Sequence, residues 1–157
     1  LVKKMNEIGM LIDLSHSSDQ TFWDTLELTK APVIASHSSA RVLFNHPRNL
    51  SDEMLKRLTQ NGGVVGINFY PEFLSATRKA SLKDAVDHLE HMLKVAGANT
   101  VGLGSDYDGI EIVPTGLEDA SKYPAITAEL HKRGHSDDVI QKVLGGNFMR
   151  VFAEVLK

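Results

Sequence analysis

Four short apolar segments alternate with segments of helical periodicity, and this alternation constrains the fold more than any other feature of the sequence. The apolar segments are residues 10–14, 32–35, 63–69 and 100–103. Each has the length of a buried β-strand, and residues 63–69 are rich in β-branched side chains. Strands that alternate with helices are typical of a parallel sheet joined by crossover helices. We therefore expect an α/β fold in which residues 1–157 form one domain.

Helix-start and helix-stop residues mark the segments between these strands. Gly9 is a candidate C-cap for a first helix, and residues 17–19, Ser51 and Ser81 are candidate N-caps for the next three. The predicted helices cover residues 1–8, 21–29, 51–60, 81–96, 123–133, 136–144 and 147–155. A natural chain rarely opens inside a helix that has no N-cap. We therefore expect that this sequence was cut from a longer one.

Composition excludes several classes of partner and of site. Hydrophobic residues make up 42% of the chain, charged residues 24%, and the net charge is −3, so neither nucleic acid nor an anionic membrane is an expected partner. No apolar stretch reaches the roughly 20 residues that a membrane-spanning helix needs. Because the chain has no cysteine, any metal must be held by nitrogen and oxygen ligands.

Two histidines and a carboxylate follow the predicted strands at equivalent points. His16 and His37 come directly after the first and second strands, and Asp106 follows the fourth. The chemistry of α/β folds lies beyond the carboxyl ends of parallel strands, and these ends converge if the sheet closes into a barrel. Imidazole and carboxylate are the ligands that zinc takes when thiolates are absent. Each residue alone could be an ordinary strand-end or turn residue, but the joint pattern favours a metal site.

Other site chemistries fit the sequence less well. No strand is followed by a G-x-S-x-G nucleophile motif, and the glycine pair at residues 102 and 104 lacks the third glycine of a dinucleotide-binding loop. Residues 106–109 resemble the start of a calcium loop without its remaining acidic ligands. His88 and His91 lie three apart, which suits a metal pair, but a solvated helix surface is the better interpretation. Arg48, in a loop after Pro47, could clamp a substrate carboxylate or simply lie on the surface.

These stretches together resemble the C-terminal part of the membrane (renal-type) dipeptidases. The resemblance covers essentially the whole chain with order and spacing kept, through residues 13–16, 36–40, 68–70, 104–109, 116–119, 121–124, 146–148 and 150–152. It implies a (β/α)8 TIM-type barrel with two zinc ions, of which this chain supplies the last four βα units. The dipeptidases hydrolyse dipeptides, so the resemblance implies a dipeptide substrate.

The resemblance also implies a role for each candidate residue. His16 and His37 correspond to the two histidines that bind the second zinc, and Asp106 to the aspartate that handles the proton of the attacking water. Arg48 corresponds to the arginine that holds the C-terminal carboxylate of the dipeptide. Asn68 lies in the substrate-binding part of the pattern. Phe73 stands where the animal enzymes carry a tyrosine near that carboxylate, so substrate choice is expected to differ.

The family's first-strand His-x-Asp pair and its bridging glutamate precede the part that this chain resembles. We therefore expect residues 1–157 to be inactive alone and to need the N-terminal barrel half, in the same polypeptide or by association. A homo-oligomer is a further expected assembly. The absence of cysteine and of a lipid-anchor signal suits a soluble, cytoplasmic bacterial enzyme. The alternatives are a degenerate or structural barrel and another binuclear-metal amidohydrolase that acts on cyclic amides or esters.

Overall fold

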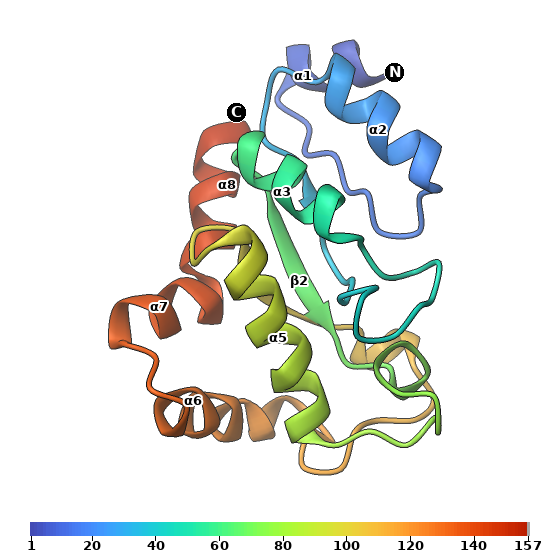
Figure 1. The fold of residues 1–157 in the computed structure, drawn as a ribbon. Coiled ribbons are helices and arrows are strands. Elements are labelled where there is room, and N and C mark those ends of the chain that lie inside the picture. Colours follow the sequence, from blue (N-terminus) through green and yellow to red (C-terminus); the bar gives the residue numbers. More distant parts are fainter. Residues whose placement is uncertain (157) are drawn as a thin grey trace.

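Residues 1–156 form an α/β fold in a computed structural model, with helices packed on both faces of a small parallel sheet (Figure 1). None of the helices in this range is long and apolar enough to cross a membrane. The longer helices are α1 (Val2–Ile8), α2 (Asp19–Leu28), α3 (Asp52–Gln60), α5 (Leu82–Ala96), α6 (Tyr123–Lys132) and α8 (Asn147–Val155). Shorter helices are α4 (Pro71–Leu74) and α7 (Asp137–Gln141), with 3-10 turns at Tyr107–Gly109 and Ala120–Lys122.

The sheet has the strand order β1-β2-β3, and all its pairings are parallel. Its strands are β1 (Ile34–Ala35), β2 (Val64–Asn68) and β3 (Val101–Ser105). A crossover helix separates each strand from the next, α3 between β1 and β2 and α5 between β2 and β3. The prediction of parallel strands joined by crossover helices is therefore confirmed for these three strands.

The expected strand over residues 10–14 is reduced to a single parallel bridge, so this prediction is wrong in extent. Asp13 pairs with Ile34, through hydrogen bonds from Leu14 N to Ile34 O (2.8 Å) and from Ile34 N to Ile12 O (2.9 Å). The chain turns immediately afterwards, because Asp13 Oδ1 accepts the main-chain N–H of Ser15 at 2.9 Å. A side chain that binds its own following backbone ends the extended segment early.

Side-chain alternation along the strands separates two packed faces. Val65 and Ile67 of β2 point toward the main core, which includes buried side chains of α3 and α5. Val64 points the other way and packs with Val151 and Val155 of α8. In Figure 1, α3 overlaps the upper end of β2, α5 runs beside its lower part, and α8 lies to the left of its upper part. α8 packs against Ile34 and Val64, the first residues of β1 and β2, whereas the candidate residues lie at the carboxyl ends of the strands.

The predicted capping residues are used largely as expected. Gly9 ends α1 with φ 70°, and the hydroxyls of Ser18 and Ser51 accept main-chain N–H groups at the starts of α2 and α3. The predicted helix over residues 136–144 is instead split, because α7 passes into a π-helical turn at Lys142–Gly146. Gly145 has φ 158°, which interrupts the regular helix before α8 begins.

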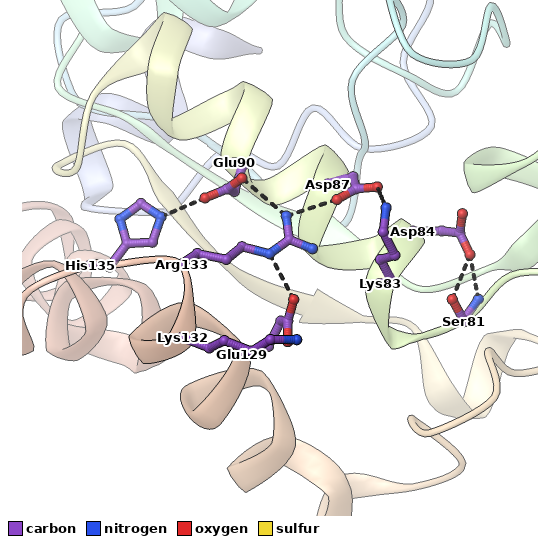
Figure 2. Close-up of polar contacts among 9 residues, drawn as sticks. All are labelled: Ser81, Lys83, Asp84, Asp87, Glu90, Glu129, Lys132, Arg133 and His135. Carbon is purple, nitrogen blue, oxygen red and sulfur yellow. Dashed lines mark hydrogen bonds and ion pairs between the residues drawn. The ribbon is translucent and has the colours of Figure 1, made fainter.

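A polar network on the outer face of α5 ties it to the end of α6 (Figure 2). Arg133 contacts Asp87 at 2.7 Å, Glu90 at 3.0 Å and Glu129 at 2.9 Å, and His135 contacts Glu90 at 2.9 Å. These ion pairs lower the pKa of the Glu129 carboxyl, and the carboxylates in turn raise the pKa of Arg133. The outer face of α5 is therefore joined to the end of α6.

The segment after the π-helical turn anchors α8 to the amino ends of the strands. The buried Asn147 amide donates to Ala98 O at 2.7 Å and to Val101 O at 2.8 Å. Arg150 donates to Gly62 O at 2.7 Å and to Asn99 O at 2.8 Å. Residues 146–152, which carry part of the family resemblance, therefore have a structural role, because they contact the end of the sheet away from the candidate site.

Candidate active site

The structure brings four of the predicted site residues together at the carboxyl ends of the strands. His16 Nε2 lies 2.9 Å from His37 Nε2, and His37 Nε2 lies 3.8 Å from Asp106 Oδ2. Asn68 Nδ2 donates to the same Asp106 oxygen at 3.0 Å. The expected convergence of the strand ends is thus confirmed as geometry, whereas the role of each residue stays a prediction.

Strained backbone marks the same positions. His16 has φ 69°, Ser105 has φ 39° and Asp106 has φ 77°, all in the left-handed region. In residues 1–156 only one other non-glycine residue has a positive φ, and it is Arg78, in an exposed loop. Left-handed backbone costs a non-glycine residue about 1–2 kcal/mol, and such residues cluster at functional sites. The strain therefore supports the location of the site independently of its side chains.

His37 is held at both its main chain and its ring. Ser15 Oγ accepts from His37 N at 2.9 Å and lies 3.3 Å from His37 O. Ser36 Oγ lies 2.8 Å from His37 Nδ1 and also contacts Asp13 Oδ2. Burial lowers the pKa of the His37 ring, against the opposing effect of the Asp106 carboxylate. A neutral imidazole whose Nε2 carries no proton is the form that binds a metal through Nε2.

Asn68 is buried and faces Asp106. Its Oδ1 accepts the main-chain N–H of Tyr70 at 2.6 Å, so its Nδ2 is the group that reaches the Asp106 carboxylate. The predicted substrate contact of Asn68 is not tested by this geometry. The contacts place Asn68 against Asp106, where its amide can fix the direction of the carboxylate.

Arg48 and Phe73 form a second part of the site. The guanidinium carbon of Arg48 lies 5.5 Å from the centre of the Phe73 ring, which suits a cation–π contact. The His46 ring lies on the same phenyl group, with ring centres 4.5 Å apart. Arg48 Nη2 is buried and has no hydrogen-bond partner among residues 1–156, and burial lowers the pKa of the guanidinium. A buried charged donor without a partner is costly, and a ligand carboxylate is the group that would satisfy it.

Three residues that contact the site were not singled out from the sequence. Asp13, Ser15 and Ser36 belong to stretches that carry the family resemblance, but no role was predicted for them. The available signal was a hydroxyl residue directly before each strand-end histidine, Ser15 before His16 and Ser36 before His37. A short polar side chain at such a position can reach a backbone or ring nitrogen nearby.

The interpretation of His88 as part of a solvated helix surface is wrong. His88 is 2% exposed, its Nδ1 accepts from Ala40 N at 3.1 Å, and its Nε2 lies 3.2 Å from Leu74 O. Burial lowers the pKa of this ring. Its neighbour His91 pairs with Asp52 at 2.7 Å. The two histidines therefore serve separate packing contacts and do not form a metal pair.

The donor set at the strand ends fits part of a metal site. Within residues 1–156 no group of three or more His, Cys, Asp or Glu side chains could hold a metal ion. The two facing imidazole nitrogens of His16 and His37, beside the Asp106 carboxylate, have the chemistry of zinc ligands. The chain thus offers two nitrogen donors of a nitrogen–oxygen set, and further ligands are needed to complete it.

Comparisons with known proteins match the chain throughout. The family model for membrane dipeptidase (Peptidase family M19) matches residues 1–157. An uncharacterized dipeptidase of Schizosaccharomyces pombe is 49% identical over 152 residues, which is 95% of this chain and 36% of that protein. The chain therefore spans about a third of the length of this curated relative.

Solved structures of a metallo peptidase, a probable dipeptidase and an amidohydrolase also match nearly the whole chain. A metallo peptidase from Rhodobacter sphaeroides, crystallised with a phosphinate mimic of the dipeptide L-Ala-D-Ala, is 30% identical with a TM-score of 0.92; the match covers 98% of this chain and 45% of that one. A probable dipeptidase from Pseudomonas aeruginosa is 28% identical with a TM-score of 0.92, over 98% of this chain and 52% of its own. An amidohydrolase from the same organism is 30% identical with a TM-score of 0.90, over 98% and 55%.

Proposed function

This chain belongs to the membrane dipeptidase family, and we propose that it forms the part of a metal-dependent dipeptidase site that binds one metal and the substrate carboxylate. The observation that carries the proposal is the arrangement at the strand ends. Two imidazole nitrogens face each other beside a carboxylate, near a buried guanidinium donor that has no protein partner among residues 1–156. Metal ligands, a proton acceptor and an anion clamp are the parts that metal-assisted peptide hydrolysis needs.

We infer that the chain is the last four βα units of a (β/α)8 barrel. The three parallel strands and the bridge at Asp13 supply the four expected positions. The solved relatives match nearly all of this chain with about half of their own length. The remaining metal ligands are then expected from the part of the relatives that this chain does not span, which is the N-terminal barrel half.

His16 and His37 would hold a zinc ion through their Nε2 atoms. A bound zinc pair lowers the pKa of its water and polarises the scissile carbonyl. Asp106 lies beside His37, and its carboxylate would take the proton of the attacking water and return it to the leaving amine. Asn68 donates to one oxygen of that carboxylate and limits its rotation. These side chains thus place a proton carrier beside the metal ligands.

Arg48 would bind the C-terminal carboxylate of the substrate. The Arg48 guanidinium lies over the Phe73 ring, which packs against His46, and this packing would limit the distance between the clamp and the metal ligands. A longer peptide would place its carboxylate elsewhere, which explains selection for dipeptides. The mimic of L-Ala-D-Ala bound by the Rhodobacter relative supports L-D dipeptides as one substrate class, and we propose L-L dipeptides as the other.

A substrate with a blocked carboxylate tests the clamp directly. In the protein of full natural length, Arg48→Ala should raise the KM for a dipeptide by about 10–100-fold, because a charge-assisted, buried ion pair contributes about 1.5–3 kcal/mol. The KM for the matching dipeptide amide should change little. Arg78→Ala, at an exposed arginine, is the matched control. An equal effect of Arg48→Ala on the dipeptide and the amide would refute the clamp.

The amidohydrolase of similar structure favours a second candidate, a metal-dependent hydrolase of other amides. Such an enzyme would use the same imidazoles and carboxylate without requiring a free substrate carboxylate. Steady-state assays of the natural-length protein on dipeptides, dipeptide amides and cyclic amides separate the two. Higher kcat/KM on cyclic or blocked amides than on dipeptides would favour the second candidate.

A further inference from the structure

We propose that Asp13 and Ser36 form a positioning pair that fixes the His37 ring in the tautomer with its proton on Nδ1. The Nε2 lone pair of His37 is thereby directed toward His16 and Asp106. The inference deepens the proposed function, on which its metal-binding consequence rests. Among residues 1–156 the hydrogen bonds of the Asp13 and Ser36 side chains do not include His16, so the pair acts through His37 and is not itself part of the reacting groups.

The direction of the hydrogen bonds follows from what each group can donate. The Asp13 carboxylate only accepts: its Oδ1 takes the main-chain N–H groups of Ser15 and Ser36, both at 2.9 Å, and its Oδ2 takes the Ser36 hydroxyl. A serine hydroxyl has one proton, and Ser36 gives that proton to Asp13. At its 2.8 Å contact with His37 Nδ1, Ser36 can then only accept. His37 must carry its ring proton on Nδ1.

The second carboxylate oxygen of Asp13, Oδ2, has a role separate from the turn that ends the extended segment. Oδ1 alone accepts both main-chain N–H groups, that of Ser15 in the turn and that of Ser36 after β1. Oδ2 is turned to the Ser36 hydroxyl, whose only other hydrogen bond within residues 1–156 is to the His37 ring. Metal-binding histidines characteristically donate their second ring nitrogen to an oxygen acceptor, which sets the tautomer and the ring orientation. Here the Ser36 hydroxyl is that acceptor. The Asp13 carboxylate takes the hydroxyl proton, so the hydroxyl oxygen is left to accept from His37.

The backbone around Ser36 keeps this acceptor in place. The Ser36 carbonyl oxygen lies against Gly66 of β2 and Gly104 of β3, where a Cβ on either glycine would overlap it. On the other side, Ser15 Oγ bonds to both the N–H and the carbonyl of His37. The main chain on either side of the His37 ring is therefore fixed, and the remaining freedom of the ring is its rotation and its tautomer. Those are the two properties that Ser36 Oγ determines.

The tautomer can be measured in the metal-free protein of full natural length. Long-range 1H–15N spectra of the protein with 15N-labelled histidine distinguish the two tautomers, and the His37 signals are assigned as those lost in His37→Gln. We expect the wild-type ring to carry its proton on Nδ1. Observation of the proton on Nε2 in the wild-type protein would overturn the proposal without recourse to any variant.

Variants of the pair then test its cause. Ser36→Ala should give a mixture of tautomers, and Ser36→Thr, which keeps the hydroxyl, should restore the wild-type spectrum. Asp13→Asn can donate its amide proton to Ser36, so the hydroxyl turns to His37 and the proton moves toward Nε2. Ser17→Ala is the matched control, because the Ser17 hydroxyl binds Leu14 O in the same loop without contact to His37.

Metal affinity is the second readout. Loss of a group that orients a metal ligand typically weakens metal binding by about 10–100-fold. We expect a loss of this size of zinc affinity in Ser36→Ala and in Asp13→Asn, and less than about threefold in Ser36→Thr and Ser17→Ala. Unchanged spectra and unchanged zinc affinity in the first two variants would overturn the proposal. A protein that binds zinc with the expected tautomer but cleaves no dipeptide would instead count against the proposed function alone.

Discussion

At the scale of single residues, the buried His88 and the partly exposed His37 differ in what their ring nitrogens contact. His88 uses both nitrogens on main-chain groups, Ala40 N and Leu74 O, and has no free position. His37 uses Nδ1 on Ser36 and presents Nε2 to His16 and Asp106. A ring with both nitrogens satisfied by backbone stabilises packing, whereas a ring with one nitrogen directed at other titratable groups can bind a ligand.

The buried His88 ring predicts a pH dependence of stability. Burial lowers its pKa in the folded protein, whereas the unfolded value is about 6.5. The unfolded chain therefore binds more protons below that pH, and the stability that the neutral ring contributes is lost as the pH falls below about 6.5. Between pH 7.5 and 5.5 the free energy of unfolding should fall.

Denaturant titrations of the natural-length protein check this contribution. His88→Gln, whose amide can still reach Leu74 O, should have a shallower pH slope than the wild type, by at most about 1.4 kcal/mol per pH unit for one proton. Some slope should remain, because burial also lowers the pKa values of His37 and His46. Equal slopes in the wild type and the variant would show that His88 does not titrate as described.

The positions of the site residues could be predicted from the sequence wherever the ends of the strands could be predicted. His16, His37 and Asp106 follow strand-like segments, so elementary sheet geometry brings them together. The contacts of Ser36 and Asp13 could not be predicted in the same way, because they depend on side-chain rotamers and on the early turn after Asp13. The burial of His88 likewise depends on which neighbours cover its helix face.

At the scale of elements, two side chains of α8 itself, Asn147 and Arg150, determine where this helix lies. Asn147 and Arg150 bind four main-chain carbonyls between the helices and the strands that follow them. Three of those carbonyls belong to loops and one belongs to the first residue of β3. Loop carbonyls have no neighbouring strand to supply a donor. The two side chains thus supply donors to main-chain acceptors, of which Val101 O is buried, and they fix the helix at the same time.

Removal of the Asn147 amide should destabilise the fold without changing the site. Asn147→Ala leaves Ala98 O and Val101 O without their donor, so we expect a loss of about 1–3 kcal/mol in the free energy of unfolding. Met149→Ala, at a 65% exposed position of the same helix, should cost much less. Chemical denaturation measures both, and a loss in Asn147→Ala no larger than in Met149→Ala would contradict the anchoring role.

Element boundaries show which local signals are sufficient. The serine and glycine caps define helix ends through contacts within a few residues, and these predictions hold for α1, α2 and α3. The π-helical turn at Lys142–Gly146 was missed, because a glycine pair in a helical segment does not reveal on its own that the backbone departs from the α-helix at Gly145.

At the scale of the whole molecule, the sheet of residues 1–156 has two outer edges. Residues near Asp13 make only one bridge beyond β1, and no described strand pairs with the far side of β3. Parallel strands are characteristically covered on both faces and, in a barrel, paired on both edges. The relatives are about two to three times as long as this chain, which is consistent with additional strands that close the sheet into a barrel.

Isolated residues 1–157 should therefore not behave as a stable monomer. We expect no cooperative thermal transition in calorimetry of this segment as a monomer, because the edges and the apolar surface beside them remain uncovered. The natural-length protein should unfold cooperatively. A sharp, reversible transition of the monomeric segment would show that its own core is sufficient and would contradict the half-barrel account.

The metal content of the natural-length protein, measured beside its dipeptidase activity, tests the central claim most directly. We expect about two zinc ions per chain, as a two-metal site requires, with hydrolysis of a dipeptide. His37→Ala should lose bound zinc and activity together, whereas His131→Ala, at a half-exposed histidine far from the strand ends, should keep both. A wild-type protein without metal, or a His37→Ala variant with full zinc content and activity, would contradict the account.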